Sequence, residues 1–353
     1  MRCVAALLPF WAAVAIALAA WAQDPQGHRL NPFVPYPPPP ETDVPTIAGV
    51  GSSGQYGPLE VGSRVAGRSW QEYVSSGPAE LGSTTPMHVA PAEPSWAGAD
   101  QAWSWQLLPE GLVYRSYLAG VKEPRFASVW SYDERLGSIW DGALGGRVGV
   151  LRFGTTDSVQ PEGWQLDFEG AVLPRIAWDH DRDLVTVDFR YGVPITYGRG
   201  RFQTKLAFYH LSSHMGDEWM IRQQTLSRIN YSRNAVVWGN SWFITPAIRL
   251  YGEAGWAYYI DGGSKPWEFQ FGADYSPARA EGYRGAPFLA VNSQLRQELD
   301  FGGNFVVQTG WQWRGAAGHL FRLGLQYYAG ASDQFETFRQ YENKVGLGLW
   351  YDY

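Results

Sequence analysis

From Trp103 onward, short runs of alternating apolar and polar residues recur along the chain, separated by turn residues. The clearest run is Trp267 to Tyr275, in which every odd position is apolar and every even position is polar or glycine. A period of two is the pattern of a β-strand with one apolar face. The last run sets Val345, Leu347 and Leu349 against glycines in the same way. This part of the chain is therefore predicted to be all-β.

About twelve such runs follow one another between Leu112 and the C-terminus, and most have about the ten residues that a tilted strand needs to cross a bilayer. No run after Trp103 is apolar for long enough to form a transmembrane helix. The approximate spans are 112–119, 145–153, 164–173, 184–193, 202–211, 234–244, 247–259, 267–275, 287–296, 304–313, 320–328 and 344–353. The pattern predicts an antiparallel up-and-down transmembrane β-barrel of about 12 strands.

The gaps between these runs fit such a barrel. With an even strand number and the N-terminus inside, the three longest gaps (120–144, 212–233 and 329–343) all fall on the outer side. The shortest gap, Thr245-Pro246, falls on the inner side. Long outer loops and short inner turns are typical of outer-membrane barrels.

Of the chain, 45% is hydrophobic, 16% aromatic and only 18% charged, yet the mean hydropathy is −0.27. This composition indicates that apolar residues alternate with polar ones and are not collected in long apolar segments. The polar positions of the strands would face a packed, salt-bridged lumen or a pore. They are Asp188, Arg190, Arg249, Glu253, Glu268, Gln270, Asp274, Gln308, Gln312, Arg314, Arg322 and Gln326. The alternative is a soluble exported β-barrel or sandwich, such as a binding protein, whose aromatic face is its core.

The first hundred residues differ in character. Residues 1–22 have the features of a signal peptide: Arg2, an apolar stretch and the small-x-small sequence Ala20-Trp21-Ala22. An uncleaved anchor helix is the alternative. Residues 23–100 are rich in Pro, Gly and Ser and are predicted to be a disordered periplasmic segment, leaving 101–353 for the barrel. Cys3 is the sole cysteine, so the mature chain has neither disulfides nor a thiolate metal site.

The densest polar cluster begins at the outer end of the predicted strand 202–211. His210, Ser212 and His214 share the parity of apolar residues such as Leu206, which places them on the lipid-facing side. A His two residues before a Ser on one strand face can accept the hydroxyl proton of a serine nucleophile. Asp217, Glu218 or a residue such as Asn230 could orient the His. The plain alternative is a strand end that continues into a polar surface loop.

Metal binding at this cluster is the weaker hypothesis, because a spacing of four between His210 and His214 suits a helix rather than a strand. The acidic run 179–183 resembles the start of a calcium-binding loop, but Leu184 occupies the position at which such a loop has its turn glycine. No phosphate-binding or dinucleotide-binding motif occurs. We therefore expect no metal and no cofactor.

Three resemblances add to this interpretation. The final strand, ending on Tyr353, resembles the C-terminal signal of the outer-membrane barrel-assembly machinery. The run from Trp105 to Tyr353 resembles a bacterial family known as domain of unknown function 1207, which implies no activity. The matching stretches are Leu108 to Leu112, Tyr117 to Gly120, Lys122 to Arg125, Tyr209 to His214, Tyr251 to Gly255 and Gly346 to Tyr351.

The pair His210-x-Ser212 is similar to that of the outer-membrane phospholipase A and lipid A deacylase barrels, whose His-x-Ser lies on the barrel exterior. The resemblance implies that His210 is the base and Ser212 the nucleophile. The phospholipase motif continues with Asn, whereas this chain has Ser213. The third member of the triad is not placed by the resemblance.

The functional expectation follows from these observations. The protein is expected in the outer membrane, as a structural or transport barrel or, alternatively, as a surface lipid-ester hydrolase. Its expected partners are outer-membrane lipid, the secretion and barrel-assembly machinery, and a small solute or lipid substrate. The chain has a net charge of −6 and thus no excess of basic residues that could bind phosphates, so nucleic acid is not an expected partner.

Overall fold

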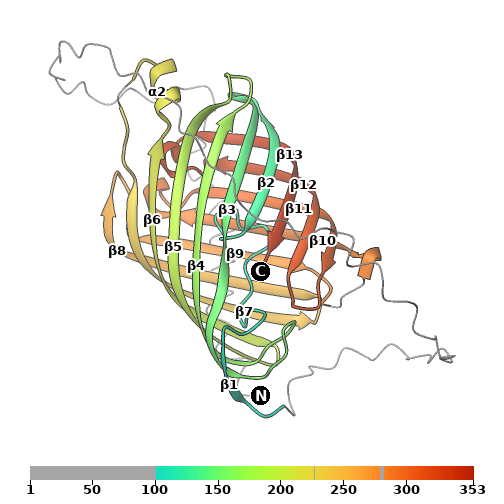
Figure 1. The fold of residues 1–353 in the computed structure, drawn as a ribbon. Coiled ribbons are helices and arrows are strands. Elements are labelled where there is room, and N and C mark those ends of the chain that lie inside the picture. Colours follow the sequence, from blue (N-terminus) through green and yellow to red (C-terminus); the bar gives the residue numbers. More distant parts are fainter. Residues whose placement is uncertain (1–100, 226, 279–281) are drawn as a thin grey trace, which may run out of the picture. The chain divides into compact units, whose positions relative to one another are not determined.

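The computed structural model describes residues 101–225, 227–278 and 282–353 (Figure 1). The predicted signal peptide (1–22) and the Pro-rich segment (23–100) lie outside these residues. The described part is a β-barrel. Its strands are β1 (Ser104–Leu107), β2 (Phe126–Asp133), β3 (Gly137–Gly154), β4 (Gly163–Ala177), β5 (Asp183–Arg199), β6 (Phe202–Met215), β7 (Ser232–Thr245), β8 (Ile248–Asp261), β9 (Trp267–Tyr275), β10 (Ala286–Arg296), β11 (Gly303–Arg314), β12 (Leu320–Ala331) and β13 (Tyr341–Asp352).

Strands β2 to β13 form a closed antiparallel ring in which each strand pairs with its neighbours in sequence. The ring closes where β13 pairs with β2, from Lys344 opposite Asp133 to Tyr351 opposite Phe126. Closure leaves no free strand edge in the ring, which a barrel in lipid requires. The predicted antiparallel barrel of about twelve strands is confirmed. The short strand β1 pairs separately with the last residues of β3.

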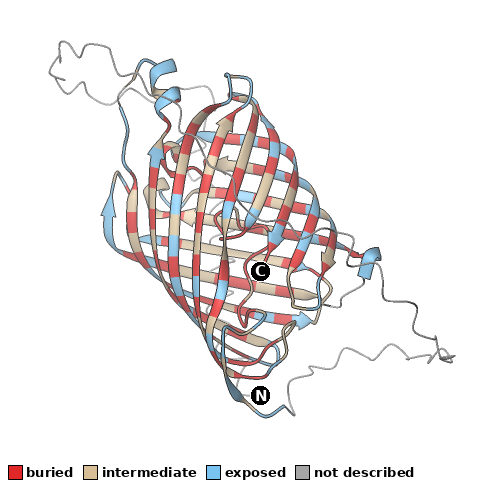
Figure 2. Ribbon diagram, viewed as in Figure 1, coloured by how far each residue is buried: buried red, intermediate tan, exposed pale blue. Residues whose placement is uncertain are grey.

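Buried and more exposed residues alternate along the strands (Figure 2), and many large apolar side chains are among the exposed ones. Trp130, Leu206 and Leu347 are among the many large apolar side chains exposed on the exterior, whereas Arg147 and Arg322 are fully buried inside. A soluble protein has the opposite arrangement and rarely exposes so continuous an apolar surface. The aromatic face is thus the outside of the barrel and not the core of a soluble sandwich. Among the described residues, no helix is long and apolar enough to cross a bilayer.

The two ends of the barrel differ, and we call them inner and outer. The inner end carries β1 and Tyr353, and the outer end carries helix α2 (Asp217–Arg222) and the connection 332–340 (Figure 1). Three single turns of 3-10 helix lie between strands: η2 (Gly282–Arg284), η3 (Gln297–Leu299) and η4 (Phe335–Thr337). The two-residue inner turns are 200–201 and 246–247.

The prediction of a first strand at 112–119 was wrong. Residues 108–125 are here named the inner plug; from Leu112 onward this segment runs inside the barrel, and Leu112, Tyr114 and Leu118 are all buried. A strand of the ring must present one face to the exterior, whereas neighbours such as Val113 and Tyr117 are also buried, so both faces of this segment meet protein.

The first strand of the closed ring is β2, which lies within the gap 120–144 that was expected to be an outer loop. Its alternation is hidden in the sequence because Val129, on its inner face, is as apolar as Trp130 on its outer face. The connection from β2 to β3 spans only residues 134–136. The strand count was right because this missed strand replaced the wrong one.

Candidate functional site

Several polar side chains interrupt the apolar exterior near the outer end of β6 and β7. His210 and Ser212 lie on β6, opposite Asn234 and Ser232 on β7. The backbone N–H of Ser213 donates to the carbonyl of Tyr231 at 2.9 Å. Because hydrogen-bonded and non-hydrogen-bonded pairs alternate along an antiparallel ladder, His210–Asn234 and Ser212–Ser232 are both non-hydrogen-bonded pairs, in which opposite side chains approach most closely.

A hydrogen bond fixes the imidazole of His210. Its Nδ1 lies 2.6 Å from Oδ1 of Asn234. An amide oxygen can only accept, so Nδ1 is the donor of this bond, and in the neutral form of the ring Nε2 is then the acceptor nitrogen. The ring of Tyr191 lies 5.1 Å from the imidazole, centroid to centroid, and covers it from β5. This arrangement holds an oriented imidazole on the outside of the barrel.

The hydroxyl of Ser212 occupies the same outer face of β6, about 7 Å along the strand from His210 by Cα separation. It is half-buried, and among the residues described it takes part in no side-chain hydrogen bond. Phe189 lies opposite it on β5, with the ring of His214 packed edge-on at 5.8 Å. The hydroxyl is therefore without a side-chain hydrogen bond, two residues along the strand from the oriented imidazole and next to aromatic rings.

The structure does not bring the predicted orienting residues to His210. Asp217 and Glu218 form the exposed first turn of α2, and the backbone N–H of Asn230 faces the carboxylate of Glu336. Asn234 occupies the orienting position instead, and it was not among the predicted residues. The signal was present, because Asn234 shares the parity of Val236 and Trp238 and is thus a polar residue on a lipid-facing side.

The metal hypothesis finds no support in the geometry. Within residues 101–225, 227–278 and 282–353, no three His, Cys, Asp or Glu side chains gather as a metal site would require. The carboxylates of the run 179–183 have other partners: Asp179 accepts from the N–H of Ser138 at 2.7 Å, and Asp181 and Asp183 both pair with Arg222 of α2. That run is a salt-bridged outer turn.

The lumen is filled by two insertions, the inner plug and the connection 332–340, here named the outer plug. Arginines of the barrel wall donate to backbone carbonyls of the inner plug: Arg152 to Gly111 at 2.8 Å, Arg249 to Ser116 at 2.7 Å and Arg322 to Leu118 at 3.1 Å. Lys122 of the plug pairs with Asp188 of the wall at 2.7 Å. The wall thus holds the plug by its backbone as well as by its charges.

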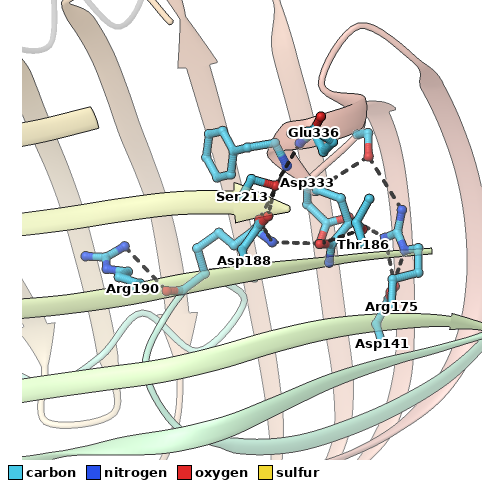
Figure 3. A network of polar contacts seen from close by, with 12 residues as sticks. Asp141, Arg175, Thr186, Asp188, Arg190, Ser213, Asp333 and Glu336 are labelled. Carbon is cyan, nitrogen blue, oxygen red and sulfur yellow. Dashed lines mark hydrogen bonds and ion pairs between the residues drawn. The ribbon is translucent and has the colours of Figure 1, made fainter. Parts of the chain in front are cut away.

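The outer plug is held by a network of buried charges (Figure 3). Arg175 lies between Asp141 (2.6 Å), Asp333 (2.7 Å) and Glu342 (2.5 Å), and Lys344 contacts the same three carboxylates. Burial opposes ionisation of Asp333, yet the cations around it, Lys344 first, hold its pKa well below its ordinary value. The network joins the two plugs, because Asp333 also lies 3.7 Å from Lys122.

Replacing Arg175 by methionine is expected to destabilise the barrel by about 3–5 kcal/mol, because it leaves three buried carboxylates with one cation fewer. The readout is the temperature at which the folded, fast-migrating band disappears in gel electrophoresis. The control is Arg228→Met, which changes an exposed arginine of an outer connection. Equal transition temperatures for the two variants would show that the network adds no stability.

Comparison with solved structures finds outer-membrane barrels. The outer membrane phospholipase A from Escherichia coli shares 9% identity, with 67% of this chain and 93% of that chain covered and a TM-score of 0.44. The Salmonella typhi outer membrane phospholipase dimer with bound calcium shares 10%, covering 68% and 91%, with a TM-score of 0.44. The KdgM porin in complex with disordered oligogalacturonate shares 8%, covering 64% and 99%, with a TM-score of 0.38. These likenesses extend no further than the fold.

The closed ring and its apolar exterior define an antiparallel β-barrel of the outer-membrane type. No curated protein matches the chain. Residues 64–353 match the family described as "Protein of unknown function (DUF1207)", and the chain belongs to that family. The resemblance drawn from the sequence is confirmed.

Proposed function

We propose that the protein is an outer-membrane lipid-ester hydrolase that works on the outside of its barrel. Ser212 is the nucleophile, His210 the general base and Asn234 the residue that orients the base. The observation that carries the proposal is the 2.6 Å bond from His210 Nδ1 to Asn234 Oδ1 on the lipid-facing side. Barrel stability alone does not require an oriented imidazole and an unbonded hydroxyl on an outward face that is mainly apolar.

The chemistry follows the usual two steps of acyl transfer. As Ser212 Oγ attacks the ester carbonyl carbon, its proton passes to Nε2 of His210. The ester C–O bond then breaks, the leaving alcohol takes that proton, and the acyl group stays on Ser212. A water molecule, deprotonated by His210, releases the fatty acid and restores the serine. The bond from Ser212 to His210 forms when substrate binds, since such hydrogen bonds often tighten only in the complex.

The position of the site suits a lipid substrate. His210 and Ser212 lie near the outer end of β6, and below them Leu206 and, on the neighbouring strand, Val236 continue the exposed apolar surface. A lipid could lay its acyl chains on these residues while its ester reaches Ser212. The filled lumen favours such an exterior reaction over transport of a solute through the barrel. The location in the outer membrane and delivery by the barrel-assembly machinery belong to the same proposal.

The test uses the purified full-length protein in detergent micelles. Phospholipid and lipid A are offered in separate assays, and a fluorophosphonate probe is used to label the nucleophile. We expect release of fatty acid from one of the two lipids and labelling at Ser212, located by mass spectrometry of peptides. Absence of both hydrolysis and labelling in a correctly folded barrel would overturn the proposal. Labelling at Ser232 instead would overturn the choice of nucleophile.

Replacing Asn234 by alanine is expected to lower kcat roughly 10–100-fold with little change in KM, because the base loses its orientation but not its basicity. The matched control is Asn240→Ala, which removes another half-buried, outward-facing asparagine of β7. The comparison is made by initial rates on the lipid that the wild type hydrolyses. Equal losses in both variants would mean that Asn234 acts only through strand stability.

A further inference from the structure

A second feature lies at the opposite end of the barrel, where the inner plug leaves a cavity of about 40 Å³ against β8, β9 and β11. Its polar lining includes Arg115 of the plug, Arg249 and Asp274 of the wall, and Arg314 at the end of β11. A water molecule needs about 10–15 Å³ measured in this way, so the cavity has room for a few waters or one small polyatomic ion.

The positive charges at this cavity outnumber the carboxylates that pair with them. Arg249 is paired with Asp274 at 2.6 Å. Arg314 donates only to neutral acceptors, the carbonyls of Gly318 and Pro277 and the hydroxyl of Ser276. Arg115 donates to the carbonyl of Val159. In the described part of the chain, neither Arg115 nor Arg314 has a carboxylate within ion-pair distance.

The other carboxylate side chain on the cavity wall, that of Asp352, is already shared. It accepts from Arg322 at 2.8 Å and from Arg125 at 3.0 Å, so one negative charge serves two guanidinium groups. Burial and the neighbouring Arg314 and Arg249 hold the pKa of Arg115 well below its ordinary value. The inner end of the lumen thus has an excess of buried positive charge, which is costly in a low-dielectric interior.

We propose that this cavity binds a small oxyanion, phosphate or sulfate, between Arg115 and Arg314. The planar fork of a guanidinium group matches the oxygens of such an anion, and two arginines, one on the plug and one on the wall, can both donate to it. The bound charge offsets the excess that the barrel leaves unpaired. A free ion and the phosphate group of a larger solute that enters from the inner end share this chemistry, and the test below distinguishes them.

The test measures thermal unfolding of the full-length protein in detergent against increasing inorganic phosphate or sulfate, with chloride at equal ionic strength as reference. We expect a saturable rise of about 5 °C or more at a hundredfold excess over Kd. The rise should disappear in Arg314→Met and in Arg115→Met and should persist in Arg228→Met. Because Arg115 lies on the plug, its variant keeps the proposal testable if Arg314→Met fails to fold.

Two further results complete the test. Glycerol 3-phosphate should bind as well as phosphate if the natural ligand is a phosphate monoester, and should bind poorly if it is the free ion. An equal rise in wild type and both arginine variants would reduce the effect to general stabilisation by salt and overturn the proposal. So would the absence of any saturable rise in the wild type. Neither result bears on His210 and Ser212, which lie at the other end of the barrel.

Discussion

Replacing Ser212 by alanine is expected to lower the rate of lipid-ester hydrolysis at least about 10³-fold, leaving the barrel folded. Loss of a nucleophile removes the covalent route altogether, and what remains is the assistance that the surrounding groups give to water. His210→Ala is expected to lose nearly as much, because nucleophile and base act as a unit. The measurement is fatty-acid release by equal amounts of folded protein in the same micelles.

The matched control for Ser212 is Ser293→Ala, which removes a half-buried, outward-facing serine on β10. It should retain the wild-type rate. If Ser212→Ala and Ser293→Ala hydrolyse lipid as fast as the wild type, any activity in the preparation comes from elsewhere and the catalytic role of Ser212 is refuted.

Replacing both plugs by flexible linkers is expected to turn a barrel that conducts no ions into an ion-conducting channel. The linkers would stand in for residues 109–124 and 333–339, and the first needs about ten Gly and Ser residues to join β1 to β2. The wall then keeps its charged side chains but loses the groups that fill the space between them, so water and ions can pass. Planar-bilayer recordings should show conductance steps for this variant and none for the wild type.

Folding of the linker variant is checked first, by the heat-modifiable mobility of the barrel in gels. A variant with only the inner plug replaced should conduct less than the double variant, because the outer plug with Phe335 and Phe338 remains. Conductance steps of equal size in wild type and double variant would show that the plugs do not close the barrel.

The ring of strands could be predicted from sequence because its signal is local. In β9, Trp267–Tyr275, the polarity of each residue indicates which side of the sheet it faces. The predicted and observed strands begin and end at the same residues. The inner plug could not be predicted in this way. The stretch around Tyr114 and Tyr117 has the composition of a strand, and only its partners reveal that it lies in the lumen, such as Glu253, which accepts from Tyr117 at 2.8 Å.

The residues of the candidate site likewise divide into those with a local signal in the sequence and one that depends on contacts between distant parts of the chain. His210 and Ser212 were found because they lie two residues apart on one strand, which the sequence displays. Asn234 was missed because its relation to His210 depends on the register between β6 and β7, which residues 216–231 separate. The charge excess around Arg314 likewise depends on which carboxylates the fold brings near, and no spacing in the sequence encodes that.

The central claim is that the exposed apolar face of each strand meets hydrocarbon, and spin labels test it most directly. The mature chain is expected to contain no cysteine, so single cysteines at Leu323, Leu325 and Leu347 can be labelled in protein reconstituted into lipid vesicles. All three side chains are exposed on the exterior, so a label there leaves the packed lumen undisturbed. We predict high collision rates with dissolved oxygen and low rates with a water-soluble nickel complex. High nickel and low oxygen accessibility at all three positions would contradict the claim.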